Sequence, residues 1–198
     1  MTGAFTPLSG FMTRDAYDSV VTSMRLPATP AHPASLLFPM PVVLDAPADC
    51  APRLGSTLLL RHRGLPLALM RVDSVWRPDK AAEAHAVLGT TSLEHPGVRA
   101  IASERGPVYL GGPITAGLAL PTRPWPSPTP AEIRARLRAR PFRDVVAFQC
   151  RNPVHRAHHA LYSRSLTAQN VRPGATLLIH PTVGPTQEDD IPGEPVCF

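Results

Sequence analysis

Residues 147–160 read AFQCRNPVHRAHHA, and this stretch says most about how the chain folds. The apolar run Asp144-Val-Val-Ala-Phe148 leads into it and predicts a short buried strand. Asn152 is a good helix N-cap, and Pro153 suits the first helical position, where its missing N–H costs nothing. We therefore expect a strand, a polar turn and a helix that begins at Pro153.

The polar side chains of this stretch predict a site for a polyanion. Arg151 offers a fork of donors that matches a tetrahedral oxyanion, and Gln149 adds a neutral donor. His155 and His158 share one face of the predicted helix near its positive end, where they can donate to phosphate oxygens and stabilise a charged leaving group. This combination indicates phosphate chemistry on a nucleotide.

Other interpretations of the same residues stay open. The polar groups could only satisfy a buried loop and a helix start. His155, His158 and His159 could hold zinc, although the spacing lacks the Glu of H-E-x-x-H and no carboxylate lies within the motif. Cys150 alternates away from Gln149 and Arg151 along the strand, so we expect it to pack under the sheet rather than act in catalysis.

Composition narrows the class of protein. A chain of 198 residues with 43% hydrophobic content can hold one large domain or two small ones. It has no apolar run of about 18 residues and no secretory signal, so we expect a cytoplasmic protein. Three scattered cysteines predict neither disulfides nor structural zinc. The net charge of +5 suits an anionic small substrate but does not by itself distinguish one class of protein from another.

The first 120 or so residues predict a small β-barrel with helical additions. A hairpin turn is expected at Arg63-Gly64, and helices are expected over Asp15–Met24, capped by Thr13, and Lys80–Leu88, closed by Gly89. The expected strands are Pro41–Leu44, Ser56–Arg61, Leu65–Val72 and Val108–Leu110, the last running into Gly111-Gly112-Pro113.

A proline-rich connection over residues 121–130 predicts a domain boundary, with domains at 1–122 and 123–198. Thr129 is expected to cap a helix that has Pro130 at its first position and Glu132 completing a capping box. The arginines of this helix could form a nucleic-acid patch, but a solvated helix face is the preferred interpretation. These arginines are Arg134, Arg136, Arg138 and Arg140.

From Asp144 onward the pattern is strand, helix, strand. The segments are Val145–Phe148, Pro153 to about Gln169, and Ala175–Ile179. This is a β-α-β unit, which predicts two parallel strands. Ligands of such folds bind beyond the carboxyl ends of the strands. We therefore expect Gln149–Asn152 and His180–Asp190 to face one crevice.

These residues carry a family resemblance. Gln149-Cys-Arg-Asn-Pro-Val-His-Arg-Ala-His158 resembles the ATP sulfurylase (sulfate adenylyltransferase) signature Q-x-R-N-P-x-H-x-x-H. His180-Pro-Thr-Val-Gly-Pro-Thr-Gln-Glu-Asp-Asp-Ile-Pro192 is similar to the family's second motif. Six segments of the first half resemble the family in its order: Leu8–Met12, Phe38–Asp45, Arg77–Lys80, Gly89–Thr91, His95–Val98 and Gly111–Ile114.

The resemblance implies a PUA-like β-barrel domain followed by an α/β Rossmann-like nucleotidyltransferase domain. It implies the reaction ATP + sulfate → adenylyl sulfate + pyrophosphate, with Mg²⁺ carried by ATP and no tightly bound cofactor or protein metal site. Gln149 and Arg151 would bind sulfate, Asn152 the nucleotide phosphates, and His155 and His158 the departing pyrophosphate. The implied substrate-binding set is Gln149, Arg151, Asn152, Pro153, Val154, His155 and His158, with Arg151, Asn152, His155 and His158 catalytic. Whether Asp189 and Asp190 act or only shape their loop stays open.

The sequence departs from the family pattern at two places. Cys150 stands where Thr or Leu is usual, and after Glu194 the chain reads Pro195-Val-Cys-Phe198 instead of continuing through the catalytic domain. A frameshift, a premature stop or a fragment would each explain the second departure, so we expect this chain to be inactive alone. The alternative function is a non-catalytic fragment whose PUA-like half binds anions or RNA. Intact relatives are expected to be homo-oligomeric or fused to an adenylyl-sulfate kinase, with no membrane or nucleic-acid partner.

Overall fold

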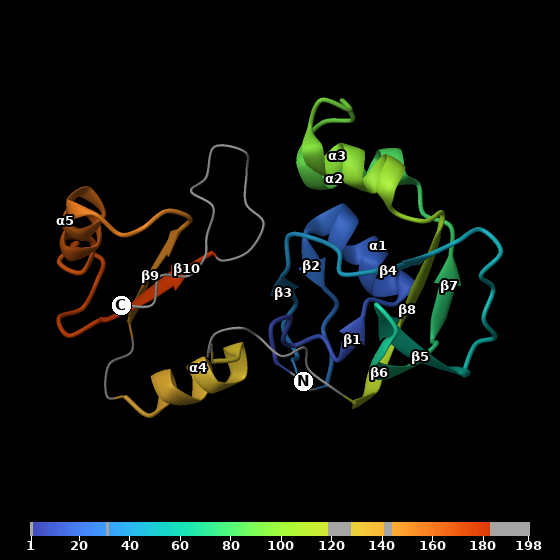
Figure 1. Ribbon diagram of the computed structural model, residues 1–198, viewed down its shortest axis with the longest axis horizontal. Coiled ribbons are helices and arrows are strands. Elements are labelled where there is room, and N and C mark those ends of the chain that lie inside the picture. Colours follow the sequence, from blue (N-terminus) through green and yellow to red (C-terminus); the bar gives the residue numbers. More distant parts are fainter. Residues whose placement is uncertain (1, 31, 119–127, 141–143, 183–198) are drawn as a thin grey trace. The chain divides into compact units, whose positions relative to one another are not determined.

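The computed structural model describes residues 2–30, 32–118, 128–140 and 144–182. The chain divides into two compact units, Gly3–Thr122 and Arg123–Phe198 (Figure 1). Most of the expected proline-rich connection lies outside the described residues. In the part of the chain that is described, no helix is long and apolar enough to cross a membrane.

The first unit is a branched sheet with helices beside it. Its described residues form a six-stranded sheet in which β1, β4, β6 and β7 all pair antiparallel with β8, and β5 pairs with β6. A separate pair, β2 and β3, follows the first helix. The strands are β1 (Gly10–Phe11), β2 (Arg25–Leu26), β3 (Leu36–Leu37), β4 (Leu44–Ala46), β5 (Thr57–His62), β6 (Leu65–Arg71), β7 (Ser74–Trp76) and β8 (Val108–Gly117). The helices are α1 (Arg14–Ser23), α2 (Lys80–Leu88), α3 (Pro96–Arg99) and a π-helix, η1 (Ala100–Glu104).

Strand β8 lies at the centre of the core because its alternating side chains enter two hydrophobic clusters. Tyr109 packs with residues of α1 and with Trp76, whereas Val108 and Leu110 pack with Met70 on the other side. A third cluster joins α2, α3 and η1 through Ala84, Val98 and Ile101. The sheet thus buries residues on both faces of one strand.

Several local signals in this unit are confirmed. Helix α2 matches Lys80–Leu88, the Asp79 side chain caps it by accepting from the Ala81 N–H at 3.1 Å, and Gly89 ends it at φ 73°. Arg63 and Gly64 both have positive φ, 49° and 81°, as a tight hairpin turn between twisted strands requires.

Two strand predictions were wrong in extent. Val42 lies before β4 rather than inside a strand, because its carbonyl accepts the Met12 N–H at 2.8 Å and β4 starts only at Leu44. β8 does not stop at the glycines but continues to Gly117. Gly111 and Gly112 let neighbouring backbones approach too closely for a side chain, so they extend the strand instead of ending it.

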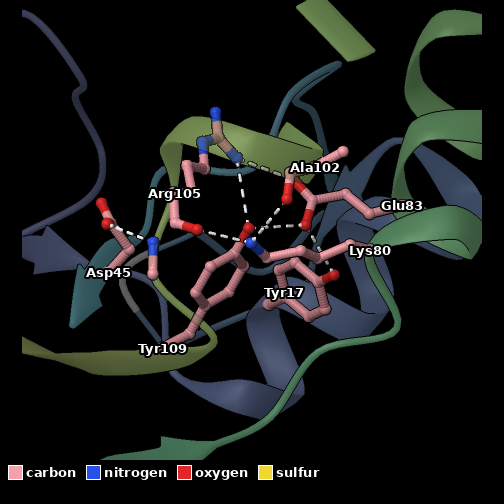
Figure 2. Close-up of polar contacts among 8 residues, drawn as sticks. Tyr17, Asp45, Lys80, Glu83, Ala102, Arg105 and Tyr109 are labelled. Atoms are coloured by element: carbon pink, nitrogen blue, oxygen red, sulfur yellow. Dashed lines mark hydrogen bonds and ion pairs between the residues drawn. The ribbon is translucent and has the colours of Figure 1, made fainter. Parts of the chain in front are cut away.

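A buried carboxylate ties four segments of the first unit together (Figure 2). Glu83 of α2 is 1% exposed and accepts from the Tyr17 hydroxyl at 3.0 Å, the Tyr109 hydroxyl at 3.1 Å and the Arg105 guanidinium at 2.8 Å. Lys80 donates to the Arg105 carbonyl at 2.5 Å. Burial, together with the Glu83 carboxylate, raises the pKa of Tyr109 to about 12, so its hydroxyl stays a donor.

The second unit contains the β-α-β arrangement expected from the sequence. β9 (Val145–Cys150) and β10 (Thr176–Pro181) are parallel and paired over six positions, and α5 (Arg156–Ser165) connects them. The helix before them, α4 (Pro130–Arg138), has the predicted capping box, with Thr129 Oγ1 accepting from the Glu132 N–H at 3.3 Å and Glu132 accepting from the Thr129 N–H at 2.6 Å.

Candidate functional site

The site predicted from the sequence lies between the end of β9 and the start of α5. Along β9, Phe148 is half-buried and Cys150 is buried, whereas Gln149 is exposed on the opposite side. The prediction that Cys150 packs under the sheet is confirmed. Arg151, Asn152, Pro153 and Val154 follow as an exposed connection.

The predicted helix start was wrong. α5 begins at Arg156, and its N-cap is His155 rather than Asn152. The His155 Nδ1 accepts the Ala157 N–H at 3.3 Å and so satisfies one donor of the helix start, the capping part that the sequence assigned to Asn152. Asn152 and Pro153 therefore belong to a longer loop, and the helix ends at Ser165 rather than near Gln169.

The two histidines of the motif contact each other and the helix start. The His155 N–H donates to His158 Nδ1 at 3.4 Å, and the two rings stack with centroids 3.9 Å apart. Because both Nδ1 atoms accept, each neutral ring carries its hydrogen on Nε2. The Nε2–H of each imidazole is therefore the group left to donate to a ligand.

Aromatic residues that the sequence analysis did not single out support this pair. The Phe148 ring lies 5.5 Å from the His158 ring and 5.8 Å from the Tyr162 ring, measured between centroids. His159, a member of the suggested zinc group, instead lies edge-on against Tyr162 at 5.1 Å. The i, i+4 spacing of His158 and Tyr162, which places both on one face of the helix, was the sequence signal that could have identified Tyr162.

The carboxyl ends of the two strands meet as expected. His180 is the register partner of Gln149, and the Gln149 amide donates to Thr182 Oγ1 at 2.6 Å. Thr182 was not singled out beforehand. The rest of the second motif, including Asp189 and Asp190, lies outside the described residues.

The charge around this loop is positive. Residues 145–182 contain four arginines and no Asp or Glu. A helix N-terminus adds partial positive charge at the same end of the unit. Among the described residues, no three His, Cys, Asp or Glu side chains gather so that they could hold a metal ion. The arrangement is one that can bind an oxyanion and neutralise developing phosphate charge.

Comparison with known families defines the class of protein. Residues 1–117 match the PUA-like domain model, and residues 127–196 match the ATP-sulfurylase model. The chain belongs to the PUA-like domain family and continues into an ATP-sulfurylase domain. Its alignment with sulfate adenylyltransferases over 193 to 196 residues, at 37–40% identity, confirms the resemblance to ATP sulfurylase.

Three similar proteins illustrate the extent of the match. The chain is 40% identical over 193 residues to a sulfate adenylyltransferase of Chloroflexus aurantiacus, covering 96% of this chain and 47% of the relative. It is 41% identical over 198 residues to a probable bifunctional SAT/APS kinase of Sorangium cellulosum, covering 97% and 32%. A solved structure, the hexameric APS kinase from Thiobacillus denitrificans, superposes with a TM-score of 0.62 at 31% identity, covering 96% and 32%. The chain thus spans about half the length, or less, of the relatives it matches.

Proposed function

We propose that this chain supplies the sulfate- and phosphate-binding loop of a sulfate adenylyltransferase, which converts ATP and sulfate to adenylyl sulfate and pyrophosphate. The observation that carries the proposal is the β9–α5 loop, where Gln149 and Arg151 are followed by the stacked pair His155 and His158. The matched ATP-sulfurylase family supports the same assignment.

In the proposed reaction a sulfate oxygen attacks the α-phosphorus of ATP. A sulfur–oxygen–phosphorus linkage forms, the bond between the α-phosphorus and the bridging oxygen to the β-phosphate breaks, and that oxygen leaves with pyrophosphate. Sulfate is already a dianion at neutral pH, so no general base is needed. The work of the site is to hold two repelling anions in line and to neutralise charge on the leaving group.

Each residue of the loop has a proposed part in that work. Gln149 and Arg151 hold sulfate, and Asn152 contacts the nucleotide phosphates. His155 and His158 donate through Nε2 to the departing pyrophosphate, because their Nδ1 atoms are used at the helix start. Pro153 and Val154 shape the backbone between these groups. Magnesium arrives as the ATP complex and is part of the substrate.

The cytoplasmic location and the oligomers or kinase fusions expected of intact relatives remain predictions. The names of two similar proteins include an APS kinase, which supports the fusion as a proposal for this family.

The test measures binding and catalysis separately in the 198-residue chain. Sulfate and an ATP analogue are titrated by calorimetry, and sulfate-dependent ATP–pyrophosphate exchange is assayed with magnesium. Arg151→Ala should weaken sulfate binding about ten- to a hundredfold, because it removes a charge-assisted hydrogen bond. Arg164→Ala, which removes an exposed arginine from the last turn of α5, is the matched control.

Binding that depends on Arg151 but not on Arg164 supports the proposal. A wild-type chain that binds neither sulfate nor nucleotide contradicts it. Sulfate-dependent exchange by this chain, lost in Arg151→Ala, would refute the expectation that the chain is inactive alone.

A further inference from the structure

Thr182 stands directly after β10 and holds the side chain of Gln149. Its Oγ1 accepts from the Gln149 Nε2 at 2.6 Å, and its own N–H donates to the Cys150 carbonyl at 2.8 Å. The backbone bond continues the parallel ladder one residue past the end of β10. Thr182 is therefore fixed to β9 by its main chain before its side chain meets Gln149.

The register explains why these two side chains meet. Gln149 lies opposite His180 in the parallel pair, and side chains alternate along each strand. Thr182, two residues after His180, returns to the same face as Gln149. The contact follows from the sheet geometry rather than from a chance conformation of an exposed side chain.

This contact has a consequence for binding. An exposed glutamine rotates about three side-chain bonds. A ligand that immobilises it binds more weakly, because the side chain loses conformational entropy on binding. Anchoring one amide hydrogen on Thr182 orders the side chain in advance. Among the described residues the second amide hydrogen of Gln149 has no partner, so it stays available to an anion.

We propose that Thr182 is a positioning residue for sulfate: it holds the Gln149 amide so that its second N–H points to the bound anion. The proposal rests on the proposed function, since Gln149 needs a fixed orientation only if the loop binds sulfate. The Thr182 hydroxyl also retains its own hydrogen, so donation from Thr182 to a neighbouring acceptor would strengthen its acceptance from Gln149.

The experiment uses the ¹⁵N-labelled 198-residue chain, three variants that test the contact, and Gln149→Ala for signal assignment. Thr182→Val keeps the shape of the side chain and removes the acceptor, whereas Thr182→Ser keeps the hydroxyl. Thr176→Val makes the same change at the other end of β10, where the side chain has no hydrogen bond to another described residue. The Gln149 side-chain amide signals, assigned with Gln149→Ala, are followed during titration with sodium sulfate and separately with a non-hydrolysable ATP analogue at constant ionic strength.

The expected result is specific to sulfate. Thr182→Val should weaken sulfate binding about two- to tenfold, the range for losing one neutral hydrogen bond, and should shift the Gln149 amide signals before any ligand is added. Thr182→Ser and Thr176→Val should bind sulfate within about twofold of wild type. The affinity for the ATP analogue should not change in any variant.

Three outcomes would overturn the inference, and they differ from one another. Wild-type affinity in Thr182→Val, with sulfate binding still lost in Arg151→Ala, removes the positioning role and leaves the proposed function intact. A wild-type chain without saturable sulfate binding removes the proposed function and this inference together. Equal losses in Thr182→Val and Thr176→Val, for both ligands, would mean that the substitutions only disturb the strand.

Discussion

At the scale of single residues, neighbouring backbone approaches two glycines of β8, Gly111 and Gly112, too closely for a side chain. A β-carbon built on Gly112 would lie 1.9 Å from the Arg71 carbonyl oxygen, and one on Gly111 would lie 2.1 Å from the Met12 carbonyl oxygen. Both contacts are with backbone, which cannot swing aside as a side chain can. The strands on either side of β8 approach because these residues have no side chain.

We predict that Gly112→Ala lowers the free energy of unfolding by about 3 kcal/mol or more, since relief requires β6 to move. Gly64→Ala is the matched control: Gly64 has a positive φ of 81° but open space around its β-carbon position. That variant should lose roughly 1–2 kcal/mol from backbone strain alone. Urea denaturation of both variants measures the difference, and equal losses would show that the close approach is unimportant.

At the scale of elements, the predictions that held rest on short-range chemistry. The hairpin turn at Arg63-Gly64, the end of α2 at Gly89 and the capping box at Thr129 depend on residues within a few positions of each other, so the sequence displays them directly. The start of α5 was missed for a related reason. Histidine is not a usual N-cap, so the pattern favoured Asn152, whereas the His155 side chain caps α5 by accepting the Ala157 N–H.

The parts that could not be predicted depend on partners distant in sequence. β8 continues past Gly111 and Gly112 because β1 and β6 pair with the residues that follow, whereas β7 pairs only with its first part, Tyr109–Gly111. In the site, the residues of the motif were found from their spacing, but the contact of Thr182 with Gln149 needs the strand register. The sequence shows which side chains alternate along a strand, but it does not show which residues of two strands lie opposite each other.

An ion pair holds the two strands of the second unit at their beginnings. Asp144, just before β9, accepts from the Arg172 N–H at 2.7 Å and from Arg172 Nε at 3.0 Å, and Arg172 lies in the turn before β10. These bonds from the Arg172 side chain and backbone lower the pKa of Asp144 to about 2. They therefore fix the start of the register that places Gln149 opposite His180.

We predict that this pair makes stability depend on acid. An unfolded Asp has a pKa of about 3.9, so Asp144 binds its proton more weakly in the folded state than in the unfolded state. The pair's contribution to the free energy of unfolding is therefore complete above about pH 4 and is lost as the pH falls through about 2. Urea denaturation followed by far-UV circular dichroism between pH 2 and pH 6 should show a steeper loss in wild type than in Asp144→Asn. Asp49→Asn, at an exposed position, should follow wild type. Parallel pH profiles for wild type and Asp144→Asn would contradict the assignment.

At the scale of the whole molecule, the first unit is held by one buried polar centre as well as by its hydrophobic clusters. Glu83 joins α2 to α1 through Tyr17, to β8 through Tyr109, and to the segment after η1 through Arg105 (Figure 2). Tyr17, Trp76 and Tyr109 pack around one another with ring centroids 5.4 to 5.9 Å apart. The helical additions are thus bonded to the centre of the sheet rather than only resting on it.

We predict that Glu83→Ala lowers the free energy of unfolding of the first unit by about 3–5 kcal/mol, because it leaves two buried hydroxyls and a half-buried guanidinium without their acceptor. Glu83→Gln, which keeps one acceptor oxygen but not the charge, should lose less. Glu94→Ala, on an exposed loop nearby, should stay within about 0.5 kcal/mol of wild type. Trp76 fluorescence in a Trp125→Phe background reports this unit alone, since the chain has two tryptophans. A loss below about 1 kcal/mol in Glu83→Ala would mean that the hydrophobic clusters hold the helices without this carboxylate. A large loss in Glu83→Ala that is smaller in Glu83→Gln would show that the hydrogen bonds of Glu83 with the surrounding donors stabilise the unit.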